Sequence, residues 1–127
     1  MHTLKFRSSK REEMVDITRE VESELPNGDG VCVLFVQHTT CGLTVNENAD
    51  PDVQSDMLGF LKRLIPQHEP HFKHGEQNSD AHIKSSLVGS SVTVPFASGK
   101  LALGRWQAIY MCEFDGPRER GVLMKTL

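Results

Sequence analysis

"VCVLFVQHTTCGLTVNENAD", residues 31–50, is the stretch that decides the fold class of this chain. The run 30–37 is apolar on both faces and rich in β-branched residues, which is typical of a central strand covered on both sides. A glycine then breaks the chain, and 43–47 is expected to pair with this strand. Each run stops at a cluster of polar, titratable side chains, at 37–40 and at 46–50.

Further strands are predicted where apolar residues alternate or β-branched residues gather, at 2–7, 14–17, 91–96, 105–115 and 122–127. Three helices are predicted from caps and helical spacing. The first, 19–25, follows Thr18 as its cap. The second begins at Pro51 after the N-cap Asp50 and ends before Pro66, and the third, 80–89, is capped by Ser79. The pattern predicts an α+β fold with mostly antiparallel sheets.

Length and charge restrict the class of protein. The chain has 127 residues, enough for one core without disulfides or metal ions, so 1–127 is read as a single domain. A net charge of −3 argues against a nucleic-acid partner. No apolar run approaches the roughly 18 residues of a membrane span, which argues against a membrane partner. Three cysteines without a CxxC pair, and no apolar signal segment, indicate a reduced, cytoplasmic protein.

The polar strand ends supply the first candidate site residues. His38 suits a general base, an orienting donor or a metal ligand, although a histidine held by a backbone carbonyl is equally ordinary at a strand end. Thr39 and Thr40 offer hydroxyl and backbone N–H groups to a phosphate or carboxylate, or serve as turn residues. Glu47 suits an acid, a base or a metal ligand, and Asn48 suits a turn or a ligand contact.

The third helix and the last long strand supply a second set of candidates. Asp80 and His82 lie two residues apart, so they cannot share one helix face. Asp80 either orients a histidine or complements the helix dipole. Lys84 is expected to be solvated unless it binds a phosphate. Trp106 and Gln107 combine a ring that stacks with an amide that reads a ring edge, although a core tryptophan is the alternative.

Several other catalytic patterns are absent. Histidines at 68, 71 and 74 follow no zinc-finger spacing, and HExxH, GxSxG, P-loop and GxGxxG motifs do not occur. Nothing beside Cys41 marks it as an activated thiol nucleophile.

Three blocks carry a resemblance to a known family: "QHTTCGLTVNENADPDV" (37–53), "NSDAHIKSSLVGSSVTVP" (78–95) and "GKLALGRWQAIYMCEFDGPRERGV" (99–122). In order and spacing they resemble the secondary thiamine-phosphate synthase family, also called YjbQ-like, from Phe6 to Val122. Cys41 stands where members of that family often carry alanine or serine, and a small side chain still fits there.

The resemblance implies a compact α+β domain with β-sandwich character, assembled as a homotrimer with sites near subunit contacts. It also implies a pocket built from the motif histidines His38 and His82, with Glu47, Asn48, Asn78 and Asp80 as partners and the pair Trp106 and Gln107. Some members hold a divalent metal ion, such as Mg or Zn, at their histidines. His74 is then the expected third ligand beside His38 and His82.

The activity implied by the resemblance is a weak joining of hydroxymethylpyrimidine pyrophosphate to a thiazole phosphate. Thr39, Thr40, Lys84 and a divalent cation would hold the phosphates, Trp106 would stack on a ring, and Gln107 with Glu47 would read the aminopyrimidine edge. Two alternatives stay open. One is metal-assisted hydrolysis of a small phosphorylated metabolite with Glu47 or Asp80 as base. The other is a trimer that binds a metabolite without turnover.

Overall fold

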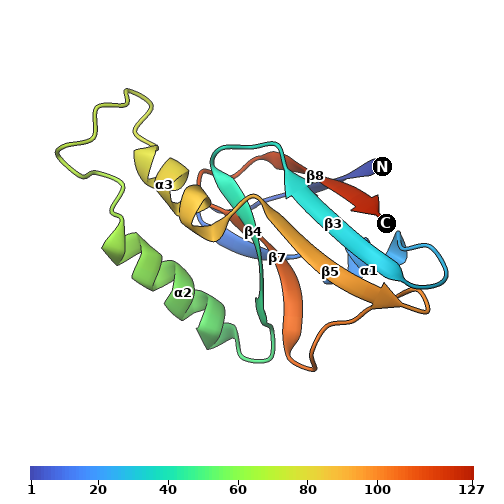
Figure 1. Cartoon of the computed structure of the whole chain (residues 1–127). Coiled ribbons are helices and arrows are strands. Elements are labelled where there is room, and N and C mark those ends of the chain that lie inside the picture. The colour runs from blue at the N-terminus through green and yellow to red at the C-terminus, as the bar shows by residue number, and fades with distance from the viewer.

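The strands form two antiparallel sheets in a computed structural model that describes residues 1–127 (Figure 1). The five-stranded sheet has the order β1 (His2–Arg7), β8 (Glu119–Thr126), β3 (Gly30–Val36), β5 (Ser91–Ala97) and β6 (Lys100–Leu101). The three-stranded sheet has the order β2 (Glu13–Asp16), β7 (Gln107–Glu113) and β4 (Cys41–Glu47). The predicted α+β class with antiparallel sheets is confirmed.

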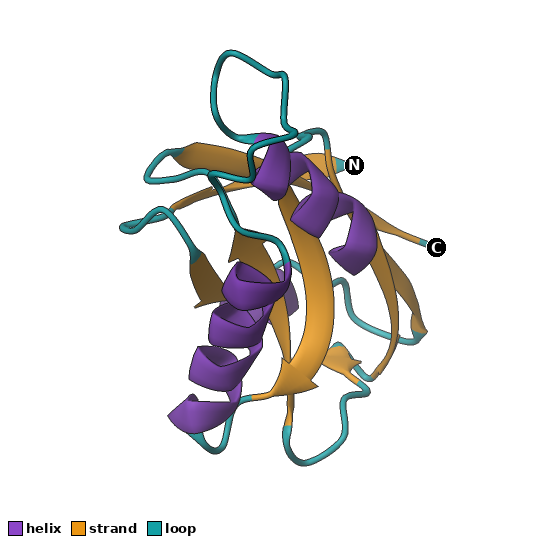
Figure 2. Cartoon of the chain, turned by 90° about the vertical axis from the view of Figure 1, so that its left-hand side faces the viewer, coloured by secondary structure: helices purple, strands orange, loops and turns teal.

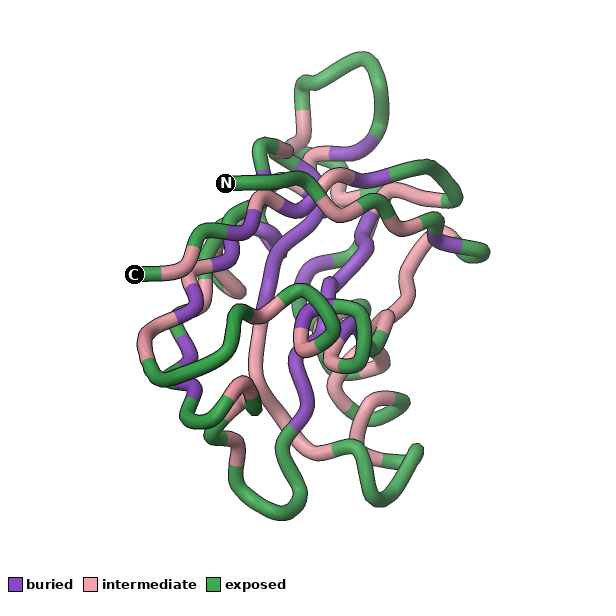
Figure 3. The backbone as a smooth tube through the Cα atoms, turned by 90° about the vertical axis from the view of Figure 1, so that its right-hand side faces the viewer, coloured by how far each residue is buried: buried purple, intermediate pink, exposed green.

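The main core lies between the two sheets, so the fold has the expected sandwich character. Leu34 and Met124 of the larger sheet belong to one buried cluster with Leu43 and Met111 of the smaller sheet. Figure 3 shows the buried stretches in the middle of the molecule and the exposed ones around them. This arrangement follows from the alternation of side chains along each strand, because every second residue points at the facing sheet.

Three helices complete the fold: α1 (Thr18–Ser23), α2 (Pro51–Leu64) and α3 (Ser79–Val88). α2 and α3 lie against the outer face of the three-stranded sheet (Figure 2). There Ala108, Tyr110 and Cys112 of β7 form a second buried cluster with Ala81 of α3. β7 is therefore covered on both faces, by the other sheet on one side and by the helices on the other.

The helix boundaries agree closely with the predicted ones. The Asp50 carboxylate accepts a hydrogen bond from the Asp52 N–H at 2.9 Å, and Pro51 occupies the first helical position. The N-cap of α3 is Asn78 rather than Ser79. Gly89 ends α3 with a φ of 102°, a backbone conformation that favours glycine.

Two predictions about the stretch 31–50 are wrong. β3 does not pair with β4, because β3 hydrogen-bonds to β5 and β8 while β4 hydrogen-bonds to β7. The residues between them carry the chain from one sheet to the other instead of closing a hairpin. β3 is also covered on one face only, since Cys32 and Leu34 are buried and Phe35 is 42% exposed.

None of the three helices has the length and apolar character needed to cross a membrane. The long connection between α2 and α3 contains no helix or strand, as its proline and glycine content predicts (Figure 1).

Candidate functional site

The chain crosses from one sheet to the other at residues 37–40, and buried charges hold this crossing in place. Arg120 and Glu113 form an ion pair in which both side chains are buried. Arg120 also donates to the Thr40 hydroxyl at 2.8 Å, and Glu113 accepts from the Ser8 hydroxyl at 2.7 Å. The residues 37–40 are thus held rigidly where β3 ends and β4 begins, a favourable foundation for a site. Thr40 belongs to this foundation, because its hydroxyl is occupied by Arg120.

A cavity of about 470 Å³ lies between this crossing and α3. We call it the histidine cavity, because His38 of the crossing and His82 of α3 both line it. Its remaining polar lining consists of four hydroxyls and one thiol, from Thr39, Ser85, Ser86, Ser90 and Cys41. The cavity therefore brings the two motif histidines together, and no carboxylate, lysine or arginine lines it.

His38 is held in one orientation by the backbone. Its Nε2 accepts a hydrogen bond from the Gly121 N–H at 3.0 Å, so its Nδ1 carries the proton of the neutral ring. Burial, together with the positive charge of Arg120, holds the pKa of His38 below its usual value. At neutral pH His38 is consequently an uncharged ring that offers one N–H donor.

His82 is held less tightly than His38. Its ring lies edge-on to the ring of His74, with 5.7 Å between the ring centroids, and no side-chain hydrogen bond or ion pair fixes it. Its backbone carbonyl accepts from the Ser86 hydroxyl at 3.0 Å. An imidazole with both nitrogens uncommitted can donate to a ligand or accept from it.

Ser85 leaves one buried hydrogen-bonding group beside the histidine cavity without a partner. The side chain is only 7% exposed, yet its hydroxyl has no hydrogen-bond partner in the protein. A buried hydroxyl without a partner costs about 1–3 kcal/mol, and native proteins keep few of them. Because Ser85 lines the cavity, a rotation about its Cα–Cβ bond would turn the hydroxyl toward a bound molecule or water. No sequence motif points to Ser85 beyond its place in the predicted third helix.

The cavity thiol is not a nucleophile at neutral pH. Burial raises the pKa of Cys41 to about 11. Thiol reactivity requires the thiolate, which is scarce at pH 7 for such a group.

Four of the predicted site residues lie at the other end of β4. Glu47 pairs with Gln107 in the strand register, whereas Cys41, beside the histidine cavity, pairs with Glu113. Six residues of extended chain separate these two ends by about 20 Å. Because 43–47 does not pair with 30–37, the polar clusters at 37–40 and 46–50 lie apart within one chain, and β4 runs away from the crossing.

We call these four residues the strand-end group: Glu47, Asn48, Trp106 and Gln107. The Asn48 N–H donates to the Trp106 carbonyl at 2.9 Å. Trp106 precedes β7 and is 54% exposed, with the Arg105 guanidinium 4.7 Å from its ring centroid. The predicted alternative of a core tryptophan is therefore wrong, and the ring is accessible for stacking.

Asp80 and Lys84 do not line the histidine cavity, because they line a separate cavity together with Arg11 and Glu12. They form an ion-pair network with Arg11 and Glu12, and Lys84 is completely buried. Burial alone would raise the pKa of Asp80, but hydrogen bonds from Arg11 and Lys84 outweigh it and hold that pKa below its usual value. The default expectation of a solvated lysine is wrong, and Lys84 does not share a cavity with Thr39.

Asn78 stands at the start of α3. It lines neither the histidine cavity nor the separate cavity beside Asp80 and Lys84. Its amide donates to the Asp115 carboxylate at 2.8 Å, and its side-chain oxygen is buried without a partner. Arg11, Glu12 and Arg120 were not predicted from the sequence, because "SSKREE" (8–13) and "GPRERG" (116–121) look like solvated turns. Only long-range pairing gives these charges their partners.

The three predicted metal ligands do not form a ligand set as placed. Neither nitrogen of His38 offers a lone pair, since Nε2 accepts from Gly121 and Nδ1 carries the proton. No group of three or more histidine, cysteine, aspartate or glutamate side chains converges on a point suited to a metal ion. A metal at His38, His74 and His82 stays a prediction that requires the His38 ring to leave Gly121.

Comparison with known proteins decides the family. Residues 2–127 match the family described as "UPF0047 protein YjbQ-like". The chain belongs to the YjbQ-like UPF0047 family. It is 50% identical to the UPF0047 protein MJ1081 of Methanocaldococcus jannaschii, over 96% of this chain and 90% of that one. It is 47% identical to YugU of Bacillus subtilis, over 100% of this chain and 98% of YugU.

Solved structures of similar proteins share the fold. The conserved hypothetical protein TT1486 of Thermus thermophilus has a TM-score of 0.97 at 47% identity, and the comparison covers 100% of both chains. A YjbQ/UPF0047 family protein of Clostridium acetobutylicum has a TM-score of 0.95 at 45% identity, again over 100% of both chains. These comparisons establish the YjbQ-like family and its fold, and they name no reaction.

Proposed function

We propose that this YjbQ-like protein binds a small phosphorylated metabolite with a polar ring in the histidine cavity. The observation that supports this most strongly is the buried, unpartnered hydroxyl of Ser85 beside two imidazoles. A neutral His38 N–H, a Ser85 hydroxyl and the uncommitted His82 ring supply both donors and acceptors. Such a lining suits an uncharged heterocycle, because a ring with amino and ring-nitrogen groups offers the complementary set.

The reaction that we propose is the weak thiamine-phosphate synthesis implied by the sequence resemblance. A carbon–nitrogen bond forms between the pyrimidine methylene and the thiazole nitrogen, and the bond from that methylene to pyrophosphate breaks. The histidine cavity would hold the aminopyrimidine and exclude water from the methylene. Its lining contains no cation to neutralise the departing pyrophosphate, which accords with a slow reaction.

We further propose that the working form is a homotrimer whose site is completed between subunits. In a closed ring each contact joins two different surfaces of the chain. Two exposed apolar surfaces are available: the groove between α2 and α3, with Phe60 and Leu87, and the ring of Trp106. A contact of this kind would bring the strand-end group of one copy to the histidine cavity of the next.

Of the two alternatives, binding without turnover has the better support. The cavity offers hydrogen bonds to a ligand, and binding requires nothing more. Metal-assisted hydrolysis has less support, since His38 as placed cannot ligate a metal ion and Glu47 lies at the far end of β4.

The test is to compare the purified protein with a His82→Gln variant. Thiamine phosphate formation from the two substrates and the affinity for hydroxymethylpyrimidine pyrophosphate are both measured. We expect His82→Gln to lose product formation and most of the affinity. His71→Gln, in the exposed loop, is the matched control and should change neither. Full activity and affinity in His82→Gln would refute the site. If His82→Gln loses affinity and the unmodified protein shows no turnover, the function is binding alone.

A further inference from the structure

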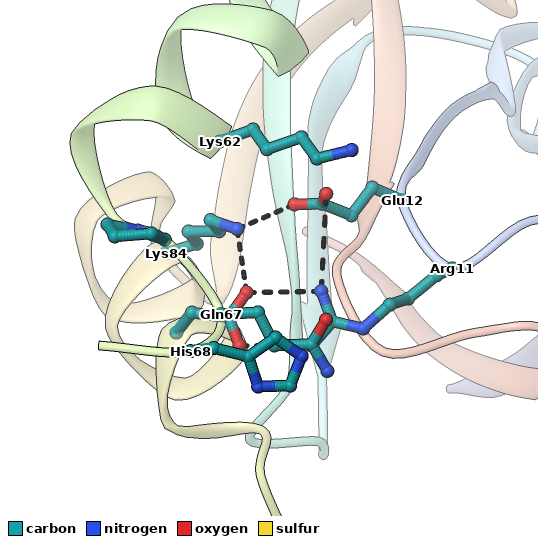
Figure 4. Close-up of a pocket in the computed structure, with 8 residues that line it drawn as sticks. Arg11, Glu12, Lys62, Gln67, His68 and Lys84 are labelled. Carbon is teal, nitrogen blue, oxygen red and sulfur yellow. Dashed lines mark hydrogen bonds and ion pairs between the residues drawn. The ribbon is translucent and has the colours of Figure 1, made fainter. Parts of the chain in front are cut away.

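A second cavity of about 470 Å³ lies on the other side of α3, lined by the ion-pair network (Figure 4). Arg11 contacts both Asp80 oxygens, at 2.9 and 3.1 Å. The Lys84 ammonium donates to Asp80 and to Glu12, each at 2.7 Å. Lys62 of α2 also lines this cavity and extends toward Glu12. We call it the charged cavity.

Stability alone does not explain such a network. Asp80 and Lys84 are 0% exposed, and buried ion pairs are commonly no more stabilising than apolar residues of the same size. An ammonium carries three N–H donors, and Lys84 uses two of them on carboxylates. Its third donor has no acceptor in the protein. Arg11 likewise uses two of its five N–H donors on Asp80.

The charges around the cavity leave an excess of one positive charge. Arg11, Lys62 and Lys84 stand against Glu12 and Asp80, and the remaining lining side chains are Pro66, Gln67 and His68. The three cations come from three different parts of the chain, so they surround the space instead of forming a flat patch (Figure 4). That arrangement suits a compact oxyanion with several acceptor oxygens.

We propose that the charged cavity binds a phosphoryl group, either of a small metabolite or as inorganic phosphate. Arg11 would donate its outer N–H groups, Lys62 would close the site from α2, and the buried Lys84 would contribute its positive charge. Asp80 and Glu12 hold the two buried cations in place when the site is empty. The inference does not rest on the function proposed for the histidine cavity, because α3 separates the two cavities.

Inorganic phosphate titrated into the full protein in a calorimeter tests the proposal. We expect one phosphate per chain, and we expect Lys62→Gln to weaken binding by about fivefold or more. Arg63→Gln is the matched control, since it removes one positive charge from the neighbouring position of α2 but does not line the cavity. Lys62 is exposed, so its substitution should not prevent folding. Equal affinity in both variants, or no binding at all, would overturn the proposal.

Two further measurements locate and identify the anion. Ser85→Ala alters the histidine cavity and should leave phosphate affinity unchanged. A loss of affinity in that variant would place the anion in the histidine cavity and contradict the assignment. Acetate should compete poorly with phosphate, whereas equal competition would show a carboxylate site and refute the phosphoryl assignment. Failure of the phosphate experiments would not affect the His82→Gln test, because His82 lines the histidine cavity.

Discussion

At the level of single residues, buried ion pairs determine which charged side chains are already engaged within the protein. Asp80 and Lys84 were candidate site residues in the sequence, but their ion-pair partners could not be predicted, because helical spacing does not reveal which partners another segment will supply. Arg11 and Glu12 supply them from a segment that precedes β2. Removing one member of such a network leaves a buried charge unpaired, which costs far more than the pair contributes.

Asp80→Asn should therefore lower the free energy of unfolding by about 3–5 kcal/mol, because Arg11 and Lys84 lose their shared carboxylate. Urea unfolding measures this change. Asp56→Asn removes the same charge from an exposed position of α2 and should change stability by less than about 0.5 kcal/mol. Similar losses in both variants would contradict the account of the network.

The same network predicts how stability depends on pH. The pKa of Asp80 in the folded protein lies below its usual value, which is about 3.9 in the unfolded chain. A carboxylate of this kind stabilises the folded state above its unfolded pKa and loses that contribution as the pH falls through the folded pKa. Urea unfolding between about pH 6 and pH 3 should show stability falling below about pH 4. The stability of Asp80→Asn should fall less steeply with pH than that of the unmodified protein. Equal slopes for the two proteins would contradict this role of Asp80.

At the scale of elements, local signals predicted helices well and strand partners poorly. Asp50, Pro51 and Pro66 mark the ends of α2, because capping depends on residues that are neighbours in the sequence. The partner of β4 could not be predicted, since pairing depends on which sheet receives the chain after the crossing at 37–40. The predicted site residues are therefore divided between two places: His38 and His82 line one cavity, while the strand-end group lies at the far end of β4.

The N-cap of α2 gives a test at this scale. Asp50→Ala removes the acceptor of the Asp52 N–H and should lower the free energy of unfolding by about 1 kcal/mol. Asp50→Asn keeps an acceptor oxygen, so it should lose less stability than Asp50→Ala. Thermal unfolding of both variants checks the order, and equal loss would show that the negative charge matters rather than the hydrogen bond.

At the scale of the whole molecule, α2 suggests that a single chain is incomplete. No residue of this helix is buried, although Phe60 and Leu64 point apolar side chains outward at 57% and 59% exposure. Together with Leu87 of α3 they form an apolar surface that a second copy would cover in the proposed homotrimer.

Light scattering after size exclusion tests this assembly. We expect a mass about three times the 14.2 kDa of the chain. Phe60→Glu places a charge in the groove between α2 and α3 and should shift the protein to a monomer. Lys73→Glu, in the exposed connection between α2 and α3, is the control and should keep the assembly. The mass of a monomer for the unmodified protein would refute the proposed homotrimer.

Whether the histidine cavity receives a ligand can be measured by nitrogen NMR of the protein with labelled imidazoles. We expect His38 to be neutral with its proton on Nδ1 at pH 7. We also expect hydroxymethylpyrimidine pyrophosphate to shift the signals of His38 and His82 and to leave that of His71 unchanged. A proton on Nε2 of His38, or unchanged signals for both cavity histidines at saturating ligand, would contradict the proposed site.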